Sequence, residues 1–113
     1  MINRVFPLGD VLSVTTGMLV GSSGLGGVHD VLGHLHNKNF YTHELSANYA
    51  KAEPFLRELL PKHYDEEMED ELDALTLLIT GVFDDEAGCS RVCDEWVARQ
   101  AERLGETITL PQL

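Results

Sequence analysis

The chain has 113 residues, 43% of them apolar, and carries 19 acidic against 8 basic residues, for a formal charge of −11. This length and apolar content predict one domain, residues 1–113, with a single compact core. The acidic charge argues against direct binding of nucleic acid or of an anionic membrane, and it favours a basic partner. No signal-peptide pattern and no run of roughly 18 apolar residues is present, so we expect a cytoplasmic location.

Two short segments near the ends of the chain have the composition of strands. Arg4 to Leu8 is apolar, but Pro7 cannot donate a hydrogen bond within a sheet, which predicts an edge strand. Thr107 to Leu110 alternates polar and apolar residues before Pro111. Because an isolated strand needs a partner, we expect the two segments to pair into a small two-stranded β element.

The rest of the pattern is helical, and the expected fold class is mainly α, a compact bundle of four to five helices. Asp10 is predicted to be the N-cap of a helix that ends near Leu19. A glycine-rich loop is expected over residues 20–27. An apolar stripe then predicts a helix that ends near Asn37 and carries Val28, Val31, Leu32 and Leu35.

Further helices are expected after Asn39. Thr42 or Ser46 can cap the first of them, in which Leu45, Tyr49 and Ala52 share a face before Pro54 interrupts it. Pro54 is tolerated best in a first turn, so residues 54–60 are predicted to form a separate short helix. The strongest helical pattern runs over residues 65–83, and its second half is apolar almost all round, which predicts the central core helix. A last helix over residues 86–104 is expected to end at Gly105.

Two cysteines, Cys89 and Cys93, lie four residues apart in a segment that is predicted to be helical. Two thiols are too few for a disulfide scaffold, so we expect both to be reduced. No histidine or further cysteine stands at zinc-ligand spacing beside them. The sequence therefore predicts no metal site and no cofactor.

An uncompensated acidic block is the most informative feature of the chain. Ten acidic residues lie between Asp65 and Glu86, whereas no Lys or Arg occurs between Lys62 and Arg91. Like charges at this density repel one another and favour a cationic partner, although a solvated helix face that maintains solubility is the alternative interpretation. The candidate partner-binding residues are Glu66, Glu69, Asp70, Asp73, Asp84, Asp85 and Glu86.

Glycines and histidines of the first half provide an alternative site. Backbone N–H groups of a glycine-rich loop that opens onto a helix can hold an anion, and imidazoles nearby can contact a phosphate. The loop lacks the spacing of a dinucleotide fingerprint and the P-loop lysine, and the histidine spacing does not suit zinc. A flexible connector and structural histidines are the favoured interpretation, and the alternative ligand-binding set is Gly24, Gly26, Gly27, His29, His36 and His43.

Three segments carry a resemblance to a known family: LGDVLSVTTG at residues 8–17, GVHDVLGHL at residues 27–35 and FYTHEL at residues 40–45. They are similar to a family of short phage and prophage proteins of unknown function, with the pattern L-G-D-V-L-S-V-T-T-G, then G-V-Y-D-[LI]-L, then [FY]-T-H-[QE]-L. Gly105 to Thr107 resembles the G-E-T ending of that family. His29 replaces a common Tyr, and His34 with Leu35 replaces a more aromatic pair. The acidic block has no counterpart in the pattern.

The resemblance implies a viral accessory origin and no catalytic residues. No nucleophile-elbow motif or paired Cys and His is present in the sequence, which favours a binding protein over an enzyme. Our leading hypothesis is an anti-CRISPR-like inhibitor of a host defence system, which binds a basic nucleic-acid-binding host protein stoichiometrically in the host cytoplasm. The alternatives are a sponge or small enzyme for a nucleotide signal and a virion structural or assembly protein. The sequence also leaves the oligomeric state open, because Leu77 or Phe83 could be a core residue or a contact in a homodimer.

Overall fold

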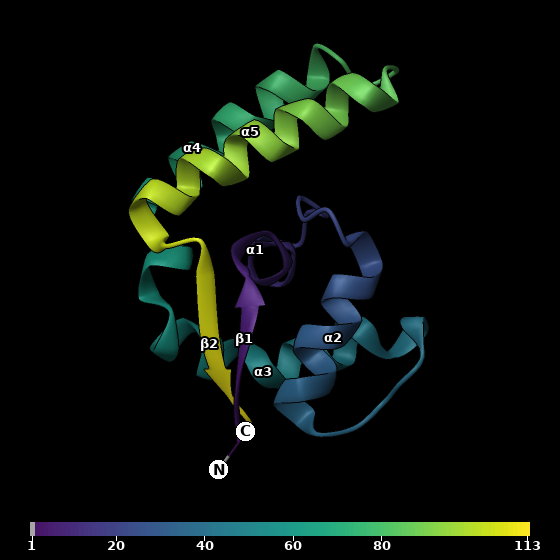
Figure 1. The fold of residues 1–113 in the computed structure, drawn as a ribbon, viewed down its shortest axis with the longest axis vertical. Coiled ribbons are helices and arrows are strands. Elements are labelled where there is room, and N and C mark those ends of the chain that lie inside the picture. The colour runs from purple at the N-terminus through teal and green to yellow at the C-terminus, as the bar shows by residue number, and fades with distance from the viewer. Residues whose placement is uncertain (1) are drawn as a thin grey trace.

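A computed structural model describes residues 2–113 of the chain, and Figure 1 shows its ribbon. Five α-helices lie between two terminal strands, so the predicted fold class is confirmed. Two short 3-10 turns, Thr42–Glu44 and Pro61–His63, precede α3 and α4. The elements follow in the order β1 (Asn3–Pro7), α1 (Leu8–Thr16), α2 (Gly24–His36), α3 (Leu45–Leu59), α4 (Glu66–Thr80), α5 (Glu86–Leu104) and β2 (Thr107–Pro111).

The two strands pair antiparallel, as the sequence predicts, with Arg4 opposite Leu110 and Phe6 opposite Ile108. One face of the pair is apolar, because Phe6 and Leu110 are both buried. The backbone N–H of Leu8 donates to the carbonyl of Glu106 at 3.0 Å, directly after the last paired residue of β1. The strand pair therefore anchors the start of α1 to the end of α5.

Helix α1 occupies the centre of the molecule, where Figure 1 shows it end-on between the other helices. Eight of its nine residues, Leu8 to Thr15, are buried. Leu8 and Leu12 belong to one hydrophobic cluster, whereas Val11 and Val14 belong to the other, so adjacent sides of α1 serve different parts of the core. Each fully buried side chain of this size contributes about 1.5–3 kcal/mol of transfer free energy, so α1 stabilises both sides of the fold.

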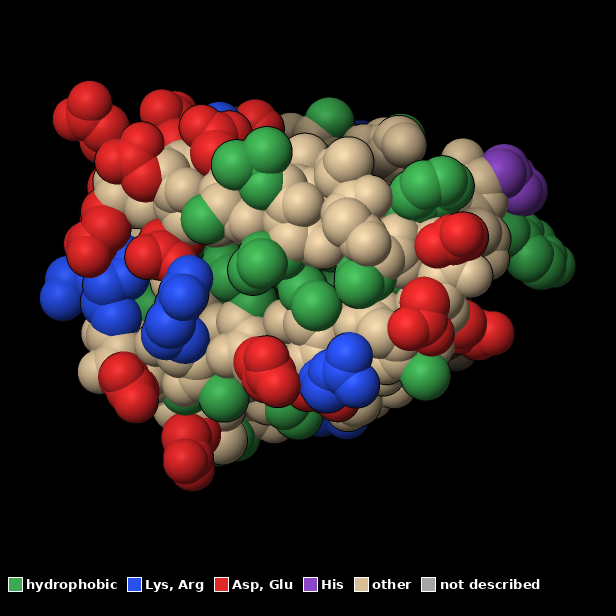
Figure 2. All heavy atoms as spheres, turned by 90° about the horizontal axis from the view of Figure 1, so that it is seen from above, with side chains coloured by type: hydrophobic (Ala, Val, Ile, Leu, Met, Phe, Trp, Pro, Cys, Tyr) green, Lys and Arg blue, Asp and Glu red, His purple; other side chains and the backbone are tan. Residues whose placement is uncertain are grey.

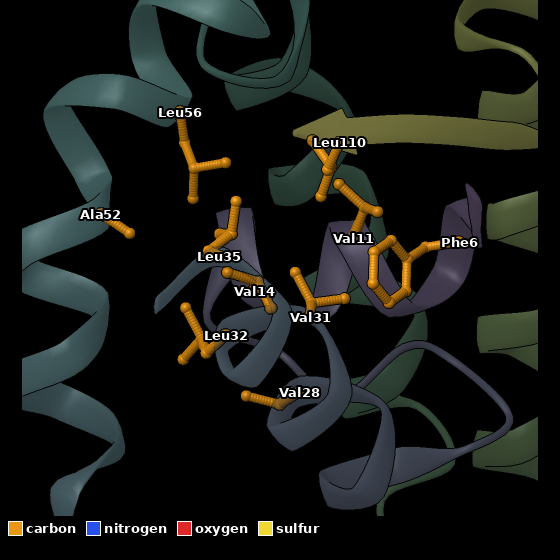
Figure 3. Close-up of a cluster of buried hydrophobic side chains, with 10 residues drawn as sticks. All are labelled: Phe6, Val11, Val14, Val28, Val31, Leu32, Leu35, Ala52, Leu56 and Leu110. Atoms are coloured by element: carbon orange, nitrogen blue, oxygen red, sulfur yellow. The ribbon is translucent and has the colours of Figure 1, made fainter. Parts of the chain in front are cut away.

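Two hydrophobic clusters lie on the two sides of α1. The second cluster joins α1 to α4 and α5, and it contains Leu8, Leu12, Val20, Met68, Leu75 and Trp96. The first cluster joins α1 to α2, α3 and the strands. Figure 3 shows its side chains converging from these elements: Phe6, Val11, Val14, Val28, Val31, Leu32, Leu35, Ala52, Leu56 and Leu110.

The prediction that α4 forms the core helix is wrong. Only Met68 and Leu75 of α4 are buried, whereas the side chain of Leu77 is 75% exposed. The physical reason is that α4 packs mainly against α5 and the turn at Pro61–His63, and reaches α1 only through its buried Met68 and Leu75, so much of its surface stays in solvent. No helix among residues 2–113 is long and apolar enough to cross a membrane.

Two predicted boundaries in the first half also differ from the structure. Helix α1 begins at Leu8, directly after Pro7, so Asp10 lies in its first turn and is not the N-cap. Helix α2 begins at Gly24, because residues 17–23 suffice to turn the chain from α1 into α2. The candidate glycines Gly24, Gly26 and Gly27 are therefore helical and not part of a loop.

The prediction of a separate helix after Pro54 is wrong as well, because α3 runs unbroken from Leu45 to Leu59 with Pro54 inside it. A proline in a helix interior costs about 3 kcal/mol through its missing N–H and its steric clash. Ala52 and Leu56, which flank Pro54, are fully buried in the first cluster. Tertiary packing on both sides of Pro54 offsets the local cost and holds the helix together.

The connection between α1 and α2 is held by the hydroxyl of Ser13. It donates to the carbonyl of Gly9 at 2.8 Å and accepts from the backbone N–H groups of Val20 at 3.1 Å and Gly21 at 3.0 Å. Ser13 and Val20 are buried, so no water replaces these bonds at low cost. One side chain thus satisfies two backbone donors of the turn.

We predict that Ser13→Ala lowers the free energy of unfolding by about 1–3 kcal/mol, because it leaves the backbone N–H of Gly21 without an acceptor, whereas the N–H of Val20 keeps the carbonyl of Met18 at 2.8 Å. Urea unfolding of both proteins measures the difference. Ser22→Ala is the matched control, because Ser22 is exposed and its loss is expected to change stability by less than about 0.5 kcal/mol. Equal effects of the two substitutions would contradict the assigned role of Ser13.

Candidate functional site

The acidic block lies on a helical hairpin formed by α4 and α5, which covers one side of α1 (Figure 1). Trp96 of α5 is buried against α4, and its indole N–H donates to the carbonyl of Glu71 at 3.0 Å. The carboxylate of Asp65 accepts from the N–H of Met68 at 2.9 Å and caps α4. These contacts fix the hairpin as a rigid unit of two antiparallel helices.

Cations of α5 neutralise only a few acids of the block. Arg99 and Gln100 both donate to Glu71 at 2.8 Å, and the hydrogen bond from Arg99 is the main cause that lowers the pKa of Glu71. Arg103 lies 3.3 Å from Glu67 and 3.8 Å from Asp65. The remaining acids of the block therefore lack local compensation.

All seven candidate partner-binding acids are exposed, and none forms an ion pair with another residue of 2–113 within 4.0 Å. The structure divides them into two groups. Glu66, Glu69, Asp70 and Asp73 follow one stripe of the first half of α4, at spacings of three and four residues. The second group, Asp84 to Glu86, follows the opposite end of α4, about 20 Å further along the helix axis.

Exposed apolar side chains lie between the two acidic groups. Leu77 continues the acidic stripe four residues after Asp73, and Leu78 and Phe83 follow at exposures of 50% and 76%. Figure 2 shows the hairpin from outside, with most acidic side chains at one end beside some Lys and Arg, further acidic side chains toward the other end, and apolar side chains between. Large apolar side chains that cluster on an exposed surface mark interaction sites more often than scattered ones do.

The structure does not bring the alternative ligand-binding residues together. Gly24 starts α2 and His36 ends it, so they lie about 18 Å apart. The ring of His29 contacts the hydroxyl of Thr42 at 3.1 Å, and that of His36 contacts the carbonyl of Asn48 at 2.8 Å. His43 stacks on Tyr41 instead. Gly26 and Gly27 lie in the first turn of α2, away from His36.

Metal and thiol chemistry find little support in the arrangement. Within residues 2–113, no three His, Cys, Asp or Glu side chains are placed to bind one ion. Cys89 and Cys93 are free thiols, and Cys89 donates to the carbonyl of Val82 at 3.0 Å. Burial, with smaller contributions from Cys89 and Asp94, raises the pKa of Cys93, which makes this thiol less nucleophilic at neutral pH.

The carboxylate of Asp10 is buried, which the sequence pattern did not predict. Asp10 is 6% exposed and lies against the backbone of Gly21 and Gly27, where any Cβ atom would collide with its carboxylate. Burial and the nearby charge of Asp30 raise the pKa of Asp10, and a hydrogen bond with Ser23 opposes that shift. Gly21 and Gly27 therefore allow close packing of α1 against α2.

Comparison with protein families identifies a match over residues 6–63 to a family described as a domain of unknown function (DUF7736). The chain belongs to this family. The matched region covers β1 from Phe6 and helices α1 to α3, and it ends before the acidic hairpin. No curated protein and no solved structure matches the chain. The family therefore accounts for the framework around α1, and it assigns no activity.

His63, the last matched residue, is a second buried titratable group. It is 4% exposed, and its ring lies 3.5 Å from the hydroxyl of Thr15. Burial is the main cause that lowers the pKa of His63 to about 4, with help from Arg103 and against the effect of Asp65. The fold therefore holds a neutral imidazole between α1 and the hairpin.

We predict that stability falls by about 2 kcal/mol between about pH 7 and pH 5 because of His63. The unfolded chain binds a proton near pH 6.5, whereas the folded chain resists it down to about pH 4, so acid favours unfolding in that window. Urea unfolding of wild type and His63→Gln at both pH values measures this. Between pH 7 and pH 5, the free energy of unfolding of the variant should fall by about 2 kcal/mol less than that of wild type. Equal decreases in the two proteins would contradict the prediction.

A second prediction concerns Asp10. Because its pKa is raised, the charged form is penalised in the fold, and its contribution to stability falls as pH rises past the folded pKa. Asp10→Asn keeps the shape and removes the charge, so thermal unfolding at neutral pH should occur at a higher temperature than in wild type. The difference should shrink in acid, and a lower unfolding temperature at neutral pH would refute this account.

Proposed function

We propose that this protein acts by binding a basic surface of a partner protein through the outer face of its helical hairpin. The observation that supports this proposal most directly is a set of exposed apolar side chains, Leu77, Leu78 and Phe83, between two groups of acidic residues without ion-pair partners. Apolar side chains at the centre of an interface supply most of the affinity, and charges at the rim supply steering and specificity. The hairpin carries both parts.

Charge favours a basic partner over a second copy of the chain. In a symmetric dimer through Leu77 and Phe83, the surrounding acids of two copies would approach one another, which costs free energy. A nucleic acid or an anionic membrane would meet the same repulsion. A protein groove that normally holds nucleic acid combines basic and apolar groups and fits the arrangement better.

The biological setting belongs to the same proposal. We place the protein among phage accessory proteins that inhibit a host defence system in the host cytoplasm, in the manner of anti-CRISPR proteins. The acidic hairpin would then compete with nucleic acid for the basic groove of a host effector, at one inhibitor per site. Support comes from the resemblance of residues 8–45 to phage proteins and from the charge of the hairpin.

The test uses charge reversal and apolar truncation on the hairpin. A bacterial host that restricts phage DNA expresses wild type, Asp70→Lys with Asp73→Lys, or Phe83→Ser. We expect wild type to restore phage plating and to retain a host protein in pulldowns. Both variants should weaken binding to that protein by about tenfold or more, because they remove rim charge and an apolar anchor respectively. Binding by wild type should also weaken as salt rises.

Matched controls separate the surface from bulk effects. Glu58→Lys with Glu106→Lys makes the same charge change at exposed positions outside the block, and Leu59→Ser removes an exposed apolar side chain of α3. These variants should bind like wild type. Unchanged affinity in the hairpin variants, or an equal loss in the controls, would eliminate the hairpin as the binding surface.

A further inference from the structure

A polar hollow of about 380 Å³ is lined by residues from the end of α2 and from both ends of the chain. Figure 1 shows the end of α2 beside the paired strands. Arg4 from β1 and Lys38 from the turn after α2 line the hollow, together with His29 and His34. Asp30 is the acidic residue of its wall. Cations thus outnumber acids here, in a chain with 19 acids and 8 basic residues.

The charges of Arg4 and Lys38 have no acidic partner within 4.0 Å in the described part of the chain. Arg57, Arg99 and Arg103 form the recorded ion pairs among residues 2–113, whereas Arg4 and Lys38 form none. The guanidinium of Arg4 lies 4.8 Å from the ring centroid of Phe6, which is buried. That aromatic surface orients Arg4 and leaves its N–H donors for another acceptor.

The opposite wall is fixed by hydrogen bonds. Asn37 adopts a left-handed conformation with φ of 52°, which turns the chain sharply after α2. The N–H of Lys38 donates to the carbonyl of Gly33 at 3.1 Å, and the amide of Gln112 donates to the side-chain oxygen of Asn37 at 3.2 Å. The turn that carries Lys38 is therefore ordered before any ligand binds, which lowers the entropic cost of binding.

The ring of His34 is oriented in the same way. Its Nε2 atom lies 2.7 Å from the carbonyl of Leu110, and because a carbonyl only accepts, Nε2 is the donor. The same ring packs against Phe6 at 5.4 Å between centroids. Phe6 thus positions both Arg4 and His34 at the edge of the hollow.

We propose that this hollow binds a small phosphate-bearing ligand of the nucleoside monophosphate class. Arg4 and Lys38 neutralise the phosphate, and the fork of Arg4 matches two of its oxygens. The carboxylate of Asp30 can accept from a ribose hydroxyl, and the side chains of Asn37 and Asn39 supply donors and acceptors for the base. The volume suits one nucleotide. This site is independent of the hairpin and of the function proposed for it.

Of the alternative ligand-binding residues predicted from the sequence, only His29 lines this hollow. Arg4 and Lys38, which supply its positive charge, were not among them. The glycines at the start of α2 do not contribute to it. Phosphate recognition here depends on side-chain charge and not on a helix N-terminus.

The test is titration of the isotope-labelled full chain with AMP, inorganic phosphate and adenosine, followed by NMR. We expect saturable shifts with AMP at residues 37–39 and Gln112, and weaker or absent shifts with adenosine. Arg4→Gln with Lys38→Gln should reduce AMP affinity about tenfold or more, since two charge-assisted contacts are lost. Lys51→Gln with Arg91→Gln makes the same charge change at exposed sites outside the hollow and should bind AMP like wild type.

Each other outcome overturns the proposal. Absence of saturable shifts at millimolar AMP would remove the site, and equal binding of adenosine and AMP would remove the phosphate contact. If both double variants lost AMP affinity equally, the loss would result from net charge alone. Binding of inorganic phosphate without AMP would exclude the nucleotide class. Circular dichroism of both double variants establishes that they are folded before titration.

Discussion

Helix α1 is enclosed on all sides, and both hydrophobic clusters are built against it. Its two faces bury Leu12 toward the hairpin and Val11 toward α2, so neither half of the molecule has a complete core without it. The polar side chains of α1 are enclosed as well. Ser13 holds the turn to α2, and Asp10 lies against glycines where no side chain fits. Close packing around one short helix therefore requires glycines in the neighbouring segment and a hydroxyl on the helix itself.

Because α1 takes up the inner faces of the surrounding elements, the outer face of the hairpin is free for other uses. Met68 and Leu75 are buried in the core, whereas Leu77 and Phe83 are exposed to solvent. Water screens the repulsion among the surrounding acids, so the fold tolerates a charge density that an interior could not. A partner of opposite charge would relieve that repulsion and cover the apolar side chains at the same time.

The family match excludes the acidic hairpin but includes most of the residues that line the hollow. Residues 6–63 build the framework of α1 to α3, and the acidic hairpin follows that region. The hollow takes Arg4 and Gln112 from outside the matched region and Lys38 from within it. Substitution of the exposed hairpin side chains should therefore leave the framework intact, since few core contacts depend on them.

The sequence by itself determined the pairing of the terminal strands, the existence of most helices and the exposure of the acids, because alternation, capping and charge act locally. Local patterns could not show that α4 is covered on one side only, since an apolar stretch such as residues 74–79 looks the same buried or exposed. Nor could they show that packing of Ala52 and Leu56 overrides Pro54. Only the tertiary structure brought Arg4 and Lys38 to one hollow, because their proximity depends on how β1 lies beside α2 and not on either segment alone.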